Sequence, residues 1–171
     1  GGGNSVEQFE DGLVMTFGEQ SEDVSLAVDA LLAAMPLAVR TPNGIQCSHA
    51  LPDQAWMSRF DVDVLDRSLT EDDRRGPFGS AYQMTWGRRF TGEQLSLLAD
   101  TWDVEVFIIG HLNIDTAAVR IENCAMALAS DSDGGGVVHV PLDQSIKRDE
   151  IFGRVELIQG IALPDGADTW V

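Results

Sequence analysis

The chain has 171 residues, of which 44% are hydrophobic and 23% are charged, and 28 acidic against 11 basic residues give a formal net charge of −17. This length and composition predict a single globular domain over residues 1–171. The acidic balance argues against nucleic-acid binding, and no apolar run approaches the ~20 residues that a membrane-spanning helix needs.

The cysteines and the first residues bear on cellular context. Cys47 and Cys124 both lie in apolar runs, which favours reduced core thiols in a cytoplasmic protein over a disulfide. The chain begins with three glycines rather than with methionine, so we expect it to be trimmed, processed or a fragment.

The amino-terminal part contains one clear helix. The apolar residues 13–17 are compatible with either a strand or the end of a helix. Ser21 is a candidate N-cap because acidic residues follow it in the first turn, and Pro36 marks the end of the helix. Apolar residues at helical spacing predict a buried face made of Val24, Val28, Leu31, Leu32 and Met35.

A β-hairpin is expected next, followed by a long connection. Residues 35–40 and 44–49 are apolar runs on either side of a turn with the sequence Thr-Pro-Asn-Gly. Residues 50–80 are rich in turn formers, and residues 59–67 in this stretch are expected to form a short helix or an irregular arm. Such a long connection is more often functional than random.

The second half reads as alternating strands and helices. Residues 82–86 predict a strand that gives way to a loop, and Thr91 with Gln94 predicts a capping box. The buried face of that second helix is predicted to comprise Leu95, Leu98, Ala99 and Trp102. Residues 104–109 predict a buried strand, residues 124–129 and 137–140 predict a hairpin, and the stretch from residue 143 begins with a helical pattern.

Two histidines follow apolar strands. His49 ends the strand that carries Cys47, and His111 follows Gly110 at the end of the strand at residues 104–109. Ligands of open α/β sheets bind along the carboxyl edge of the strands, so the two imidazoles could converge on one site. Metal ligation and a purely structural role are equally open for this pair, and the nearest supporting carboxylates in the sequence are Asp53 and Asp115.

Other residues carry weaker signals. Arg88 and Arg89 are either solvated surface residues or ligands of an anionic substrate, because guanidinium groups bind phosphate oxygens in a bidentate manner. His139 lies within a predicted strand, where we expect a structural or exposed side chain. Cys47 lies two residues before His49, so the two share a strand face and form a conceivable but weak zinc pair.

The order of these segments resembles that of calcineurin-like metallophosphoesterases, in particular the branch related to serine/threonine phosphoprotein phosphatases. Residues 35–40 resemble the family's proline-leucine strand, and residues 44–53 resemble the next strand, with its Cys-x-His end and a leucine-proline-aspartate stretch. Residues 82–89 resemble a strand that ends in tryptophan, residues 106–113 a Gly-His strand end, and residues 124–143 the closing hairpin. The likeness covers roughly residues 30–145.

This resemblance implies an α/β fold that forms part of an α/β/β/α metallophosphoesterase sandwich, specifically the second half of that fold with its mixed sheets. It also implies two divalent metal ions (Mn, Fe or Zn) and a bridging hydroxide that attacks a phosphomonoester of a phosphoprotein or a small phosphoester. By the same likeness, His49 and His111 correspond to metal ligands, and Arg88 or Arg89 corresponds to a phosphate contact.

The chain also departs from the family pattern. The motifs Asp-x-His, Gly-Asp-x-x-Asp-Arg and Gly-Asn-His-(Glu/Asp) are absent, and Gly110-His111 is followed by Leu-Asn. We therefore expect the carboxyl-terminal portion of such a domain, nearly inactive alone, whose exposed sheet would favour self-association. The alternatives are a non-catalytic α/β binding module derived from that fold and a mononuclear zinc domain that uses Cys47, His49 and His111.

Overall fold

The computed structural model describes residues 5–131 and 134–160. The chain divides into two compact units, Gly1–Pro36 and Leu37–Val171, which are described separately below. Among the described residues, no helix combines the length and apolar character needed to cross a lipid bilayer.

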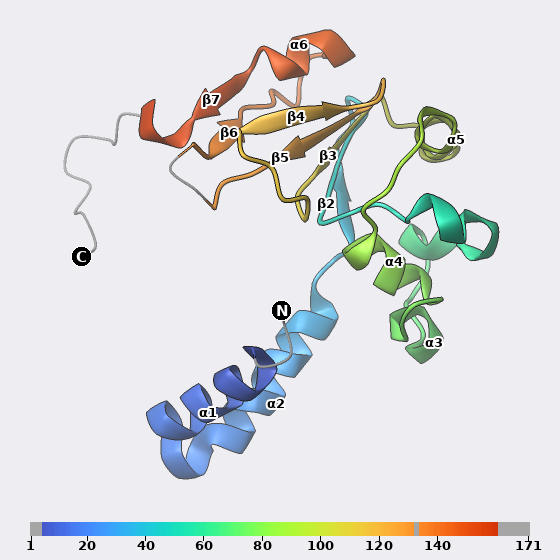
Figure 1. Cartoon of the computed structure of the whole chain (residues 1–171). Helices are drawn as coiled ribbons and strands as arrows, with labels where there is room; N and C mark the ends of the chain where they lie inside the picture. Colours follow the sequence, from blue (N-terminus) through green and yellow to red (C-terminus); the bar gives the residue numbers. More distant parts are fainter. Residues whose placement is uncertain (1–4, 132–133, 161–171) are drawn as a thin grey trace. The chain divides into compact units, whose positions relative to one another are not determined.

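The first unit is a helical hairpin (Figure 1). It consists of α1 (Ser5–Phe17), a 3₁₀ turn at Gly18–Gln20 and α2 (Ser21–Ala34), so residues 13–17 are the end of a helix. Ser21 is the first helical residue rather than the N-cap, a place taken by Gln20 without a side-chain hydrogen bond. The predicted buried face of this helix is wrong, because no residue of α2 is buried. Periodicity identifies an apolar face but does not supply a layer to cover it.

The second unit is built on a five-stranded mixed sheet, which confirms the α/β class. Its strands are β1 (Ala38–Arg40), β2 (Ile45–Ser48), β3 (Val106–Ile109), β4 (Ala118–Ile121) and β5 (Ala125–Leu128). The strand order is β1-β2-β3-β5-β4. The central strands β2, β3 and β5 are parallel, and each edge strand runs antiparallel to its neighbour. The predicted hairpin of β1 and β2 is therefore confirmed.

The predicted hairpin between residues 124–129 and 137–140 is wrong. Strand β5 pairs with β4, whereas β6 (Gly136–Val138) pairs with β7 (Val155–Leu157) in a separate two-stranded sheet. A local turn sets the pairing of β5 with β4, whereas β6 takes its partner β7 from residues 155–157. Glu122 adopts a left-handed conformation, with φ 50°, in the short turn after β4, and this turn returns the chain so that Ile121 pairs with Ala125.

The five-stranded sheet is covered on both faces. On one face, Phe107 and Ile109 pack in a cluster with the buried side of α5 (Gly92–Trp102), whose residues Leu95, Leu98, Ala99 and Trp102 are buried as predicted. On the other face, Val106 and Ile108 pack with Ile151 of α6 (Arg148–Phe152) and with residues of the two-stranded sheet. The alternating side chains of β3 thus join two apolar layers.

The predicted strand at residues 82–86 is wrong, because these residues belong to helix α4 (Ser80–Trp86). Ala81 and Met84 are buried at helical spacing, and the backbone N–H of Gln83 donates to Gly79 O at 3.0 Å. Tertiary packing of this face outweighs the weak strand preference of a seven-residue stretch that contains one tyrosine, one threonine and one tryptophan.

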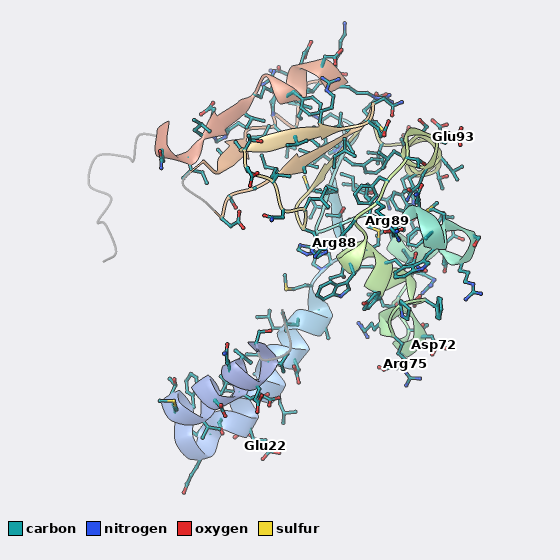
Figure 2. All side chains as sticks on the ribbon, viewed as in Figure 1. Glu22, Asp72, Arg75, Arg88, Arg89 and Glu93 are labelled. Carbon is teal, nitrogen blue, oxygen red and sulfur yellow. The ribbon has the colours of Figure 1, made fainter. Side chains whose placement is uncertain are left out.

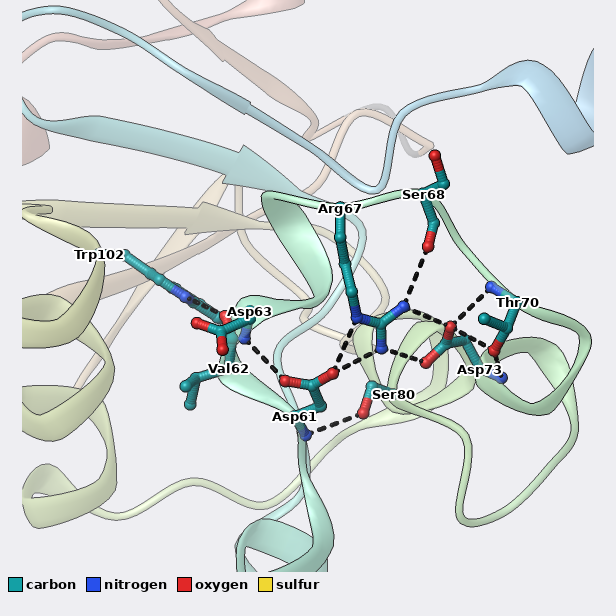
Figure 3. A network of polar contacts seen from close by, with 9 residues as sticks. All are labelled: Asp61, Val62, Asp63, Arg67, Ser68, Thr70, Asp73, Ser80 and Trp102. Atoms are coloured by element: carbon teal, nitrogen blue, oxygen red, sulfur yellow. Dashed lines mark hydrogen bonds and ion pairs between the residues drawn. The ribbon is translucent and has the colours of Figure 1, made fainter.

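Residues 50–80 are ordered by polar contacts around Arg67 (Figure 3). This stretch contains the 3₁₀ turns Gln54–Arg59 and Val62–Leu65 and helix α3 (Glu71–Arg74). The Arg67 guanidinium donates to both carboxylate oxygens of Asp73, at 2.7 and 2.8 Å, and through Nε to Asp61 at 2.9 Å. Asp73 also completes a capping box with Thr70, so one arginine joins the turn at residues 61–63 to the start of α3.

Candidate functional site

The parallel pairing of β2 and β3 brings the two predicted histidines together. Ser48 lies opposite Ile109 in the sheet, so the residues that follow both strands leave the same edge. His49 Nε2 lies 2.9 Å from His111 Nδ1, and the ring centroids are 4.7 Å apart. The convergence predicted from two strand ends 62 residues apart is therefore present in the structure.

His111 is held in an uncommon backbone conformation. Its φ of 57° is left-handed, and the backbone N–H of Leu112 donates to Gly110 O at 2.6 Å across it. A histidine at the centre of such a tight turn is constrained, and constrained residues of this kind cluster at functional sites. The turn directs one imidazole nitrogen toward His49. The other, Nε2, is buried without a hydrogen-bond partner among the described residues.

Helix α4 adds two aromatic side chains to the site, and neither was predicted from the sequence to belong to it. The Trp86 ring packs edge-on against His111, with centroids 5.4 Å apart, and Tyr82 stacks on Trp86 at 6.0 Å. Trp86 is nevertheless 52% exposed. The only sequence signal was the position of Trp86 directly before Gly-Arg-Arg, which cannot reveal a contact with a residue 25 positions later.

The surroundings of His111 favour its neutral form. Burial lowers the pKa of His111, and the positive charges of Arg88 and His49 lower it further. A neutral imidazole offers a lone pair for hydrogen bonding or for a metal ion, which a protonated one does not. His49, in contrast, is exposed to solvent.

The structure distinguishes between the two arginines. Arg89 donates through Nε to Asp53 Oδ2 at 3.0 Å and through its backbone N–H to the same oxygen at 3.3 Å. Gln54 N–H donates to Arg89 O at 2.9 Å, so the two segments are joined by both side-chain and backbone bonds. Arg89 is thus engaged in an ion pair, whereas exposed Arg88, the residue before it, acts electrostatically on His111. Both arginines are labelled in Figure 2.

Asp53 does not support a histidine, contrary to expectation. Although burial of Asp53 opposes ionisation, hydrogen bonds from the Arg89 side chain and from Ala55 N–H hold the pKa of this carboxyl below its usual range. Asp53 is 6% exposed, and its carboxylate caps the 3₁₀ turn Gln54–Arg59. Asp115, the other candidate, is exposed.

The absence of a side chain at Gly87 allows close packing between the backbone after α4 and the backbone of residues 51–53. A Cβ atom at position 87 would lie 1.7 Å from Leu51 O and 2.8 Å from Asp53 N. The backbone between α4 and the arginines therefore packs directly on the backbone that follows His49, and Ala50 N–H donates to Met84 O at 3.0 Å beside it. Only glycine permits this approach.

The other candidates do not join the histidine pair. Among the described residues, no three side chains of histidine, cysteine, aspartate or glutamate gather into a group that could hold a metal ion. Cys47 is therefore not gathered with the two histidines in the structure, and the mononuclear zinc domain stays a prediction. Of the two predicted core thiols, Cys124 is buried but Cys47 is exposed. Partial desolvation raises the pKa of the Cys47 thiol, which disfavours the thiolate that zinc requires. His139 is exposed directly after β6, as expected.

Comparisons with known proteins found no matching family model, no similar curated protein and no similar solved structure.

Proposed function

We propose that the chain forms part of a metal-dependent phosphoester hydrolase in which His49 and His111 are metal ligands. The observation that supports this proposal is the 2.9 Å approach of His49 Nε2 to His111 Nδ1 at the carboxyl edge of two parallel strands. The order of segments, which resembles that of calcineurin-like metallophosphoesterases, adds the reaction class. The α/β/β/α sandwich of that family is part of the same proposal.

The donor set fits a transition-metal ion. Imidazole nitrogen suits zinc and iron, and bonds of about 2.0–2.1 Å join such nitrogens to zinc. The two nitrogens hydrogen-bond to each other at 2.9 Å, and an ion bound by both would replace the proton that they share. In a hydrolase of this class, two bound divalent cations supply an activated hydroxide and stabilise the charge of the phosphoryl group.

The residues of this chain have defined tasks in the proposal. The lowered pKa of His111 keeps its imidazole neutral, which is the form that binds a cation. Arg88 provides a positive charge beside the histidines for the oxygens of a phosphate group, of either a phosphoprotein or a small phosphoester. Arg89 holds the loop through Asp53, so we assign the phosphate contact to Arg88.

Metal binding tests the ligand assignment. We expect the chain to bind Co²⁺ or Zn²⁺, measured by visible absorption of cobalt and by competition with a chromophoric chelator. His49→Ala and His111→Ala should each weaken binding by roughly tenfold or more. His139→Ala removes the third histidine, which lies outside the pair, and should leave binding unchanged. Equal affinities for all three variants would refute the assignment.

A second experiment tests the reaction class. Two ligands hold a dinuclear centre poorly, so we expect little hydrolysis of p-nitrophenyl phosphate by this chain with added Mn²⁺. Any turnover should be lost in the His49→Ala and His111→Ala variants and reduced in Arg88→Gln. Histidine-dependent metal binding without any turnover, even at high metal concentration, would favour the alternative of a non-catalytic binding module. Robust turnover that survives His111→Ala would contradict the proposed site.

A further inference from the structure

The helical hairpin of α1 and α2 exposes a large amount of apolar surface. Exposed large side chains on its two helices include Val6, Phe9, Phe17, Leu26, Leu31 and Leu32. Leu13 is the one residue of α1 that is buried, and α2 has none. Chains below about 40 residues seldom bury enough surface to fold alone, and short helices are marginal in water. Covering this apolar surface would therefore stabilise the hairpin.

A groove lies along α2. It has a volume of about 490 Å³, and its lining is mostly apolar: Val24, Ala27, Val28 and Leu31. Gln20 and Asp23 complete the lining at the amino-terminal end of the helix. All lining residues come from one face of α2 and the residue before it, so the groove is shallow and open to solvent. The apolar face of an amphipathic helix packs on a stripe of this kind.

All charged side chains of the hairpin that contains the groove are acidic. Residues 1–36 contain seven acidic residues and no lysine, arginine or histidine. All seven carboxylates are exposed, and Glu22 is visible on the outside of the hairpin in Figure 2. Such a surface repels nucleic acids and anionic lipid headgroups, and it also disfavours pairing with the same hairpin of a second copy.

We propose that the groove of α2 binds an amphipathic, cationic helix of a partner protein. The apolar stripe of that helix packs against Val28 and Leu31. Lysine or arginine residues flanking the stripe pair with Asp23 and with Glu19 and Glu22 beside it. Apolar contacts provide the affinity, and the unbalanced carboxylates select the charge of the partner and speed its association. This inference is independent of the proposed hydrolase function, because it uses no residue of the second unit.

Binding of designed peptides to the full chain tests the proposal. The probe is a fluorescein-labelled, 18-residue amphipathic helix of leucine and lysine, and binding is followed by fluorescence anisotropy. One control peptide has the same composition in shuffled order, so it keeps the charge and loses the stripe. Another replaces each lysine by glutamate. We expect the amphipathic cationic peptide to bind roughly tenfold or more tightly than either control.

Substitutions locate the site. Leu31→Gln removes an apolar contact from a side chain that is 65% exposed, and Ala27→Gln fills the groove; glutamine is a good helix former in both cases. Each variant should weaken peptide binding by roughly fivefold or more, as should the charge reversal Asp23→Lys. Leu97→Gln, at a comparably exposed leucine of α5, should leave binding unchanged. Far-UV circular dichroism of each variant verifies that the helices persist.

Several results would overturn the proposal. Equal binding of the shuffled peptide would show that the peptide binds by general charge attraction and not through its apolar stripe. Equal effects of Leu31→Gln and Leu97→Gln would exclude the groove as the binding site. Light scattering that shows a dimer, dissociated by Leu31→Gln, would identify a second copy as the occupant. Binding to vesicles that contain phosphatidylserine would identify a membrane instead.

Discussion

A single methyl group at position 87 should loosen the candidate site. Gly87→Ala places a Cβ atom where Leu51 O lies 1.7 Å away, and real Cβ contacts essentially never fall below 3.0 Å. The two backbone segments must therefore separate by about 1.3 Å. The φ of Gly87 is −67°, which alanine adopts freely, so the cost is one of space and not of backbone conformation.

The size of the effect follows from the bonds that cross this contact. Ala50 N–H to Met84 O and Gln54 N–H to Arg89 O are backbone hydrogen bonds of 3.0 and 2.9 Å on either side of it. Each such bond contributes about 0.5–1.5 kcal/mol, and a buried group left unpaired costs about 1–3 kcal/mol. Because Ala50 is fully buried, we expect the free energy of unfolding to fall by about 2–4 kcal/mol.

Urea denaturation followed by tryptophan fluorescence measures this loss. For a slope of about 2 kcal/mol/M, the midpoint should fall by roughly 1–2 M. Gly153→Ala is the matched control, because its added Cβ would meet only Glu150 O at an ordinary 3.5 Å. An unchanged midpoint for Gly87→Ala would refute the close packing of these segments, and with it the fixed position of Arg88 beside the histidines.

Three further predictions address the core, the polar network and the site. Leu98→Ala should lower the free energy of unfolding by about 2–5 kcal/mol, whereas Leu97→Ala, one residue earlier on the exposed side of α5, should change it little; urea midpoints measure both. Hydrogen bonds from a guanidinium hold the pKa of Asp73 below its usual range, so its stabilisation is present above the unfolded pKa of about 3.9 and is lost as pH falls through the folded pKa. Asp73→Asn should therefore destabilise the protein at pH 7 and flatten the pH dependence of the urea midpoint in acid, and a parallel pH dependence in both proteins would contradict this. Arg88→Gln should raise the pKa of His111, measured by NMR titration of the metal-free protein, because it removes a positive charge that disfavours protonation.

Elements defined by local chemistry were predictable from the sequence. The turn between β1 and β2 ends at Gly44, which has a φ of 82°. Glycine adopts such a positive φ readily, so the Asn-Gly sequence correctly predicted a hairpin. Helix α5 begins where Thr91 accepts a hydrogen bond from Gln94 N–H, and its buried face follows helical spacing. The capping box is only half formed, because the Gln94 side chain donates to Pro52 O rather than back to the cap.

Features that depend on distant partners were not predictable. Residues 125–128 and 136–138 both read as strands, but pattern alone could not show that they pair with different neighbours. Helix α4 was mistaken for a strand because its helical state depends on burial of Ala81 and Met84. For α2 the apolar face was identified correctly, but its exposure depends on which surfaces surround it, and no local signal reports that.

The candidate site has one feature that was predictable from the sequence and one that was not. The meeting of His49 and His111 follows from one topological rule, since each ends a strand and the strands are parallel neighbours. The difference between Arg88 and Arg89 does not follow from any rule about adjacent arginines. It depends on Asp53, 36 residues earlier, whose carboxylate binds Arg89.

This ion pair gives the site its charge pattern. Asp53 neutralises Arg89, so Arg88 is the arginine of the pair whose charge reaches His111. A positive charge beside an imidazole opposes a second cation, so a metal ion bound by the histidines would gain from an anion that bridges it to the guanidinium. Phosphate is such an anion. We therefore expect metal and phosphate to bind cooperatively in the wild-type chain, and Arg88→Gln to weaken phosphate binding while strengthening binding of the metal alone. Isothermal titration with Zn²⁺, with and without inorganic phosphate, separates these effects, and weaker binding of Zn²⁺ alone by Arg88→Gln would show that the arginine does not act through its charge.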